Sequence, residues 1–343
     1  MQNNHSTEMF PAARFIKEIG RGKDGARSLS REDAQSLYAA MLDGRVSDLE
    51  MGAILLAMRI KGESVEEIAG FLAAAEASFI PLQVNDTTST YAPIVIPSYN
   101  GSRHMANLTP LLALLLAREG VPTLMHGVIH DHGRVTSAEI FAALNHPASL
   151  SIGDAELCFA QSQPAFMPIS VLAPEMARLL AMRSILGVRN STHTLVKIMQ
   201  PFSSPALRLT SYTHPEYLTM LRSYFLTTAA ADRGDIFLMR GTEGETVASA
   251  KRAQQIDWFH EGTETLLVPK QTIADEIPDL PEDRDASTTA RWISDVLKGN
   301  IPVPSSIAIQ VTQCLEVCKA LKIRHNRSLV VDEEHILKGT KPG

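Results

Sequence analysis

The stretch that decides the fold lies between residues 28 and 70 and contains SLSREDA (28–34), VSD (46–48), AMRIKGES (57–64) and EIAG (67–70). Ser30, Ser47 and Ser64 each precede apolar positions that repeat at helical spacing, and serine favours the first position of a helix. Asp33 and Glu67 follow two of these serines by three residues, as in a capping box. Short helices with short connections predict a small helical bundle over residues 10–82.

The pattern changes after Leu82. Residues 92–97 and 121–127 resemble buried strands, and residues 109–119 between them resemble a helix. A strand–helix–strand unit implies parallel strands. Further strands are expected at 165–168, 207–212 and 235–239, and further helices at 174–186, 215–230, 287–297 and 304–321.

These elements predict an α/β protein with two parts. One is a small N-terminal helical bundle domain (10–82), completed by helices near 170–200. The other is a larger α/β domain (90–322) with a central, mostly parallel sheet flanked by helices. Residues 323–343 form a polar tail that need not be ordered.

Composition favours a soluble globular protein, since 45% of the 343 residues are hydrophobic and 20% are charged. We find no secretory segment near Met1, and the most apolar run (108–116) is too short to span a bilayer. We therefore expect a cytoplasmic protein without a membrane partner. Cys158, Cys314 and Cys318 are expected to be free thiols, the last two on one helix.

Charge is unevenly distributed along the chain. The formal net charge is −6, which argues against indiscriminate binding of polyanions over the whole surface. Residues 178–208 nevertheless contain four arginines and one lysine and no acid, whereas acids dominate residues 275–285. One basic face remains compatible with the acidic total.

The segments quoted from residues 28–70 resemble the small helical domain shared by anthranilate phosphoribosyltransferases and pyrimidine-nucleoside phosphorylases, the glycosyltransferase family 3 fold. The resemblance implies a helical domain that dimerises and forms one wall of a cleft. It extends over nearly the whole chain, up to about Leu321.

The phosphate-binding loop of that family reads G-T-G-G-D, followed by N-x-S-T. Here the corresponding stretch is PSYNGSRH (97–104), followed by NLTP (107–110). One glycine remains; Pro97 has no N–H and Tyr99 obstructs close approach of a ligand, so we do not expect a pyrophosphate cradle of the family type. The loop can still hold a single phosphate, or be an ordinary polar connection. The residues expected to line this vestigial pocket are Ser98, Asn100, Gly101, Ser102, Asn107, Thr109, His126 and Asn190.

Three further family motifs are altered. K-H-G-N-R corresponds to MHGVI (125–129), where a lone His126 is more often structural than catalytic. R-x-x-L-G-x-R-T corresponds to RSILGVRN (183–190), with Asn190 in place of the threonine. The paired Asp-Glu that holds magnesium corresponds to TEGE (242–245), in which Glu243 and Glu245 alternate. They are weak metal candidates, the alternative being a simple turn, and we predict no metal site.

These departures resemble the YbiB-type branch of the family, and that resemblance implies a non-enzymatic homodimer that binds nucleic acid without sequence specificity. Clustered cations suffice for phosphate contacts, and His104, His193 and Tyr99 are weaker candidates for stacking on bases. A solvated face is the alternative. The expected nucleic-acid-binding residues are Arg103, Arg178, Arg183, Arg189, Lys197, Arg208, Lys251 and Arg252.

Three functions therefore compete. The first is a catalytically inactive homodimer, paired through the helical domain, that binds single-stranded DNA or RNA and has no catalytic residue and no cofactor. The second is a pentosyltransferase that uses phosphoribosyl pyrophosphate and magnesium with an altered acceptor. The third is a protein–protein interaction module that kept a dimeric fold.

Overall fold

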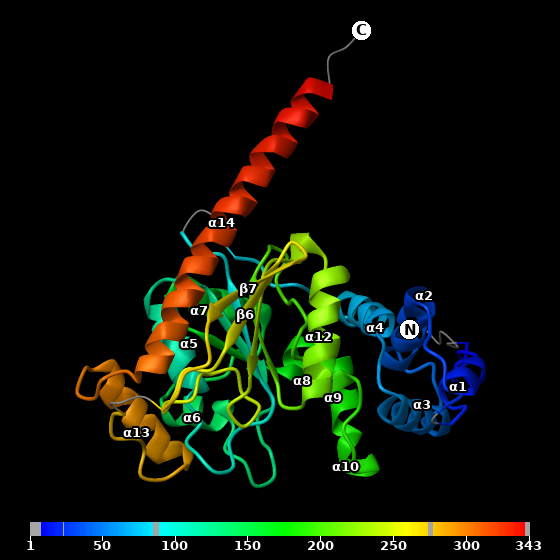
Figure 1. Ribbon diagram of the computed structural model, residues 1–343, viewed down its shortest axis with the longest axis horizontal. Coiled ribbons are helices and arrows are strands. Elements are labelled where there is room, and N and C mark those ends of the chain that lie inside the picture. The colour runs from blue at the N-terminus through cyan, green and yellow to red at the C-terminus, as the bar shows by residue number, and fades with distance from the viewer. Residues whose placement is uncertain (1–7, 23, 85–88, 274–276, 340–343) are drawn as a thin grey trace, which may run out of the picture. The chain divides into compact units, whose positions relative to one another are not determined.

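The computed structural model describes residues 8–22, 24–84, 89–273 and 277–339, without side chains after Ser328 (Figure 1). The chain divides into two compact units. The helical unit comprises residues up to Ile80 together with Ile169–Pro201 and His214–Ala229. The α/β unit comprises Pro81–Pro168, Phe202–Thr213 and the chain from Ala230 onward.

The helical unit is built from helices whose starts were visible in the sequence. Ser30 accepts a hydrogen bond from the Asp33 N–H, and Ser47 and Ser64 each form a complete capping box. The helices are α1 (Ala13–Ile19), α2 (Arg31–Leu42), α3 (Asp48–Lys61), α4 (Val65–Ala77), α8 (Ile169–Leu172), α9 (Pro174–Ala181), α10 (Arg183–Leu186), α11 (Thr192–Leu195) and α12 (Pro215–Thr227).

Close packing of α2 on α4 explains two residues of the deciding stretch. A Cβ atom at Gly70 would lie 2.2 Å from the Arg31 carbonyl oxygen, so only glycine permits this approach. Glu67 is fully buried and accepts hydrogen bonds from the Leu29 N–H (2.9 Å) and the Lys61 ammonium (2.6 Å). A buried charge is tolerated because it is paired in this way.

Two details of the helical unit differ from the prediction. Residues 174–186 form two helices rather than one, and Gly187 ends the second in a left-handed conformation. Helix α12 belongs to the helical unit, where it packs on α4, although the sequence placed it in the α/β domain. An amphipathic pattern identifies a helix but does not identify the surface that it covers.

The α/β unit contains a seven-stranded sheet within the described residues, in the order β3-β2-β1-β4-β5-β6-β7. Strands β1 to β5 are parallel, and β6 and β7 add an antiparallel hairpin at one edge. The predicted mostly parallel α/β fold is confirmed. The strands are β1 (Ile94–Ser98), β2 (Thr123–Gly127), β3 (Ala165–Pro168), β4 (Leu207–Tyr212), β5 (Ile236–Arg240), β6 (Ile256–His260) and β7 (Thr263–Val268).

Helices complete the core of this unit. Helix α5 packs against β2, and α14 packs against both α5 and β4. All of α5 but its last residue is buried, in agreement with its continuously apolar sequence. The helices are α5 (Thr109–Arg118), α6 (Ser137–Ala143), α7 (Ile152–Ala160), α13 (Ala286–Leu297) and α14 (Ser305–Gly339), with a 3₁₀ turn η1 at Ala231–Arg233.

Helix α14 continues far beyond the end expected from the sequence. Residues 323–339, expected to form a polar tail, prolong the helix; residues 340–343 lie outside the described part of the chain. Arg324 explains part of the continuation, because its guanidinium lies 2.6 Å from each oxygen of the buried Asp235 carboxylate. Trp258 Nε1 donates to the same carboxylate at 2.9 Å, so the helix is anchored to the sheet.

Two other expectations concern this unit. Cys314 and Cys318 are free thiols, both buried in α14 as predicted. Among the described residues, none of the helices combines the length and the apolarity needed to cross a bilayer.

Replacing Arg324 with alanine should destabilise the α/β unit by about 1–3 kcal/mol, because a buried carboxylate loses its cationic partner. Urea denaturation measures this change. Arg327→Ala, which removes an exposed arginine one turn later, is the matched control. Equal stability of the two variants would contradict the anchoring role.

Candidate functional site

The loop after β1 lies where ligands commonly bind in parallel α/β folds, at the carboxyl end of the strands. Gly101 holds a positive φ of 59°, and an added Cβ would lie 2.6 Å from the Val135 carbonyl oxygen. Ser102 and Val135 exchange two backbone hydrogen bonds of 3.0 Å. The loop therefore has a fixed shape, set by the segment that precedes α6.

Glu245 provides the acceptor for the backbone of this loop. The N–H groups of Asn100 and Gly101 both donate to its Oε1 at 2.8 Å, and Thr109 Oγ1 lies 3.5 Å from its Oε2. The Glu245 side chain is buried. The protein's own carboxylate thus lies where backbone amides of a loop of this kind would meet an anionic ligand.

Glu243 makes a second contact of the same type. Its carboxylate accepts the N–H of Arg103 at 2.5 Å and the N–H of His104 at 3.0 Å. Glu243 itself has a φ of 53°, a left-handed conformation that costs a non-glycine residue about 1–3 kcal/mol. The two charge-assisted hydrogen bonds offset that strain. The loop therefore has four backbone N–H groups, those of residues 100, 101, 103 and 104, that donate to the carboxylates of Glu243 and Glu245.

The sequence suggested Glu243 and Glu245 as weak metal candidates, and the structure corrects this. Both carboxylates face N–H groups, whose positive ends oppose a cation at the same oxygens. Within the described part of the chain, no three His, Cys, Asp or Glu side chains are grouped as metal ligands. The residues present therefore do not fit a magnesium–pyrophosphate group.

The other loop residues form an internal polar network. Ser98 Oγ lies 2.8 Å from Ser137 Oγ, which accepts a hydrogen bond of 3.0 Å from Asn107 Nδ2. Asn107 Oδ1 in turn accepts from the N–H and the hydroxyl of Thr109. Ser98, Asn107 and Thr109, which were expected to line a pocket, thus bond to one another or to Ser137. The buried Ser102 hydroxyl has no hydrogen-bond partner among the described residues.

His126 is fully buried beneath the loop. The Tyr99 hydroxyl lies 2.6 Å from His126 Nδ1, and burial lowers the pKa of His126 to about 3, so the ring is neutral at physiological pH. Its Nε2 has no hydrogen-bond partner among the described residues. The next residue must be glycine, since a Cβ at Gly127 would lie 1.8 Å from the Ser98 carbonyl oxygen.

Three of the predicted nucleic-acid-binding cations cluster in the helical unit. Arg183, Arg189 and Lys197 lie close enough to His193 to lower its pKa, which falls to about 3 chiefly through burial and then through these charges. We call these three cations the basic cluster. The buried Asn190 beside it is structural: its Nδ2 donates to the Leu179 carbonyl, and its Oδ1 accepts from the Thr192 N–H.

Arg178 does not share this arrangement. Its guanidinium donates to the carbonyl groups of Met41 and Leu42 at 2.7 and 3.0 Å, and it lies 3.7 Å from Glu175. These contacts hold α9 to the end of α2. Arg178 is therefore committed to the fold of the helical unit.

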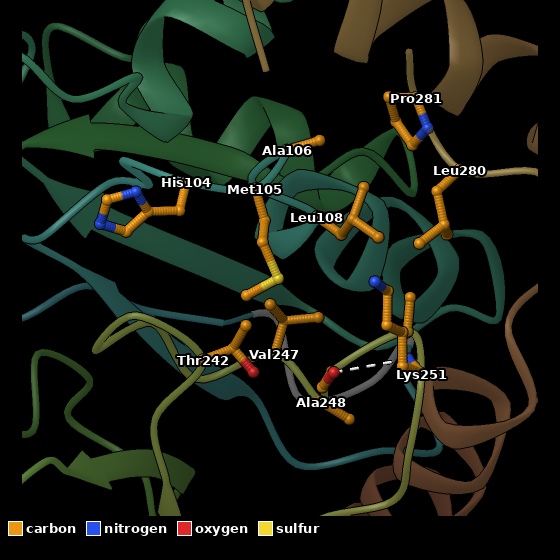
Figure 2. A pocket seen from close by; sticks show the side chains of 12 residues that line it. His104, Met105, Ala106, Leu108, Thr242, Val247, Ala248, Lys251, Leu280 and Pro281 are labelled. Carbon is orange, nitrogen blue, oxygen red and sulfur yellow. Dashed lines mark hydrogen bonds between the residues drawn. The ribbon is translucent and has the colours of Figure 1, made fainter. Parts of the chain in front are cut away.

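The remaining predicted cations lie in the α/β unit. Arg103, Lys251 and Arg252 are exposed, and Lys251 lines a surface cavity together with His104 (Figure 2). Arg208 is 2% exposed within the central strand β4, so its prediction as a surface phosphate contact is wrong. A basic residue within a strand pattern gave no sign that the strand is buried on both faces.

Sequence reasoning missed the role of Glu245 as the internal acceptor. The signal was present in two departures from the family motifs: the loop has one glycine, and Glu-Gly-Glu stands where the motif has Asp-Glu. Gly244 between the two acids is required, because a Cβ there would lie 2.0 Å from Asn100 Nδ2. Both altered motifs therefore take part in one contact, since the loop residues Asn100 and Gly101 bond to Gly244 and Glu245 of the turn.

Replacing Glu245 with alanine should destabilise the α/β unit by about 2–5 kcal/mol, because two buried amides each lose an acceptor. Glu245→Gln, which retains one carbonyl oxygen, should cost less. Thermal unfolding measures both, with the exposed Glu282→Ala as control. Sulfate should stabilise Glu245→Ala more than the unmodified protein, and an alanine variant as stable as the unmodified protein would refute this assignment.

Comparison with known proteins agrees with this architecture. Residues 13–78 match the glycosyl transferase family helical bundle domain. Two solved anthranilate phosphoribosyltransferases share the fold: that of Thermus thermophilus (TM-score 0.66, 19% identity, covering 93% of this chain and 97% of that one) and that of Saccharomyces cerevisiae in complex with PRPP and Mg (0.65, 13%, 92% of each).

Similarity in sequence covers about half of one relative and nearly all of another. Anthranilate phosphoribosyltransferase 2 of Ralstonia nicotianae is 29% identical over 188 residues, 55% of this chain and only about half (52%) of that protein. YbiB of Escherichia coli K12 is 44% identical over 304 residues, covering 88% of this chain and 92% of that protein. The chain therefore belongs to the family of YbiB, which is related to the anthranilate phosphoribosyltransferases.

Proposed function

We propose that this protein is a homodimer that binds single-stranded DNA or RNA without sequence specificity and does not transfer a phosphoribosyl group. The observation that carries the proposal is the basic cluster of Arg183, Arg189 and Lys197 around His193. The whole segment from Arg178 to Arg208 contains no acidic residue.

Burial is the main cause of the lowered pKa of His193, and the neighbouring cations lower it further. Nearby cations lower the pKa of a histidine because they oppose its protonated form, and three of them act on this ring. A phosphate backbone would experience the same field as an attraction. Cations placed in this way contact phosphates and give affinity that does not depend on base sequence.

The loop after β1 supports the absence of phosphoribosyl transfer. Transfer from a pyrophosphate donor depends on positioning and neutralising the phosphates. Here the Glu245 carboxylate occupies the loop amides with two 2.8 Å hydrogen bonds. A donor would have to displace a buried carboxylate and would meet its negative charge.

Relatedness to anthranilate phosphoribosyltransferases supports the alternative, a pentosyltransferase with an altered acceptor. That function requires the loop amides to be released by Glu245. Saturable, magnesium-dependent binding of phosphoribosyl pyrophosphate in calorimetry would favour the alternative over our proposal.

Affinity for a fluorescent oligothymidylate should fall steeply as salt rises, since bound phosphates release counterions. A plot of log affinity against log salt concentration has a negative slope. The variant Arg183→Ala/Arg189→Ala/Lys197→Ala should make this slope shallower by about 2, because each lost phosphate contact on a single strand removes about 0.7 from its magnitude. Fluorescence anisotropy at several salt concentrations measures the slope.

The matched control removes three exposed cations of the α/β unit, in Arg291→Ala/Lys298→Ala/Lys319→Ala. It changes the net charge equally and should leave the slope nearly unchanged. If both triple variants change the salt slope equally, the change follows net charge alone and the basic cluster has no specific role. Absence of binding at low salt would overturn the proposal.

An apolar face on α3 supports the homodimer. Leu49, Leu56 and Ile60 are 86%, 46% and 69% exposed and follow one another at seven and four residues, which places them along one side of the helix. Leu56 and Ile60 also line a hollow of about 250 Å³ with Ile16 and Ile19 of α1. Exposed apolar surface of this kind marks an interface, and we assign it to a second copy of the chain.

Leu56→Glu/Ile60→Glu should convert the dimer to a monomer, because two carboxylates would be buried at the interface without partners. Light scattering coupled to size exclusion measures the mass. The monomer should also bind nucleic acid more weakly, through loss of multivalency. Leu157→Glu, at a 62% exposed position in the α/β unit, is the control, and an unchanged mass for the double variant would place the interface elsewhere.

A further inference from the structure

A cavity of about 250 Å³ opens on the α/β unit, lined by the loop before α5, the segment after the Glu243–Glu245 turn and the chain preceding α13 (Figure 2). Drug-sized ligands occupy roughly 300–1,000 Å³, so this space suits one small ring system rather than an extended cofactor. Neither Glu243 nor Glu245 lines it.

The walls of the cavity are mainly apolar. Met105, Leu108, Val247 and Leu280 contribute side chains from three separate segments. Leu108 and Val247 are buried, so these walls belong to the packed core. Met105 is 40% exposed at the opening and, being unbranched, can adapt its shape to a flat ligand.

Lys251 places one positive charge in this apolar setting. Its side chain extends toward Leu108 and Leu280, and its backbone N–H is held by Ser249 Oγ at 3.4 Å (Figure 2). No acidic side chain lines the cavity among the residues that the structure describes. An ammonium group facing apolar walls selects a ligand that has a flat apolar body and an acceptor at one edge.

We propose that this cavity receives one unstacked base of a bound single strand, with the Lys251 ammonium donating to a keto oxygen on the base edge. This inference rests on the proposed nucleic-acid binding and names the part of the strand that is held here. A base has two apolar faces for Met105 and Leu280, and keto oxygens are the acceptors that lysine contacts on bases.

Charges of both signs adjoin the opening, and the backbone of the strand would follow its basic side. The exposed Asp279 and Glu282 are adjacent to Leu280 and Pro281, whereas arginines adjoin the other two segments. The exposed Arg103 is adjacent in sequence to His104, and the exposed Arg252 is adjacent to Lys251, and both His104 and Lys251 line the cavity. Phosphates flanking the inserted base would meet these two arginines. The resulting preference for keto bases is modest and compatible with sequence-tolerant binding elsewhere along the strand.

The test compares a deoxythymidine dodecamer with an abasic strand of the same length and the same number of phosphates. The full-length protein should bind the thymidine strand about tenfold more tightly, in line with the contribution of one stacked base. Ala250→Phe, which fills the cavity from its partly buried rim, should abolish this ratio and leave the salt slope unchanged. Lys251→Met should reduce the ratio to a few-fold, whereas Lys298→Met, at an exposed lysine in the same unit, should not change it.

The outcomes separate this inference from the function on which it rests. Salt-dependent binding with equal affinity for both strands would overturn the base cavity and leave backbone binding intact. If neither strand binds at low salt, the proposed function fails. The cavity is then tested separately by titrating the protein with thymidine monophosphate and following the ¹³C-methyl NMR signal of Met105. That signal is assigned by its absence from the variant Met105→Leu. A saturable shift would support a nucleotide site, and an unchanged signal would overturn it.

Discussion

Backbone N–H groups at the end of a buried strand need acceptors, and at β1 of this protein Glu245 supplies one to Asn100 and Gly101. The contact bridges β4, which lies between β1 and β5 in the sheet. Ser211 of β4 joins it through the Gly244 carbonyl oxygen at 2.8 Å, and Asn100 Nδ2 donates to the same oxygen. One short turn thereby links the carboxyl ends of β1, β4 and β5 and fixes the conformation of the loop after β1.

The arginines of this chain divide by burial and partners. Arg178 and Arg324 hold helices through carbonyl and carboxylate oxygens, and Arg208 is enclosed in the sheet. Arg103, Arg183 and Arg252 are exposed to solvent. Arg189 and Lys197 of the basic cluster are half-buried and keep part of their surface accessible, so an acidic chain can still present basic surface to a polyanion. Total charge and local field are separate quantities.

Most of the fold was accessible from the sequence because it depends on local patterns. Serine caps and apolar periodicity located the helices of the bundle, and short strand-like segments between the helical ones located β1 to β5. The β6–β7 hairpin was not predicted, because its strands mix polar and apolar residues without a regular alternation (Ile256–His260 and Thr263–Val268). The extension of α14 depends on the Arg324–Asp235 contact across 89 residues, which no local pattern contains.

The candidate site was less accessible for the same reason. Loss of loop glycines and of the Asp-Glu pair was visible in the sequence, yet the pairing of Glu245 with Asn100 joins positions 145 residues apart. Burial of Arg208 depends on its strand lying between β1 and β5. The sequence placed Arg183, Arg189 and Lys197 in one segment without acids and left open whether they share a face. All three lie near enough to His193 to affect its pKa.

The Glu245 contact also constrains how this loop can change in descent. A substitution that restored a glycine in residues 98–103 would still leave the carboxylate on the amides, and a substitution of Glu245 alone would leave two buried amides without an acceptor. Neither substitution alone therefore gives a stable loop whose amides are open to an anion, because that combination requires changes on both sides of the contact. The loop and the turn are therefore mutually dependent, and a change in the sequence of one is constrained by the residue that the other presents to it.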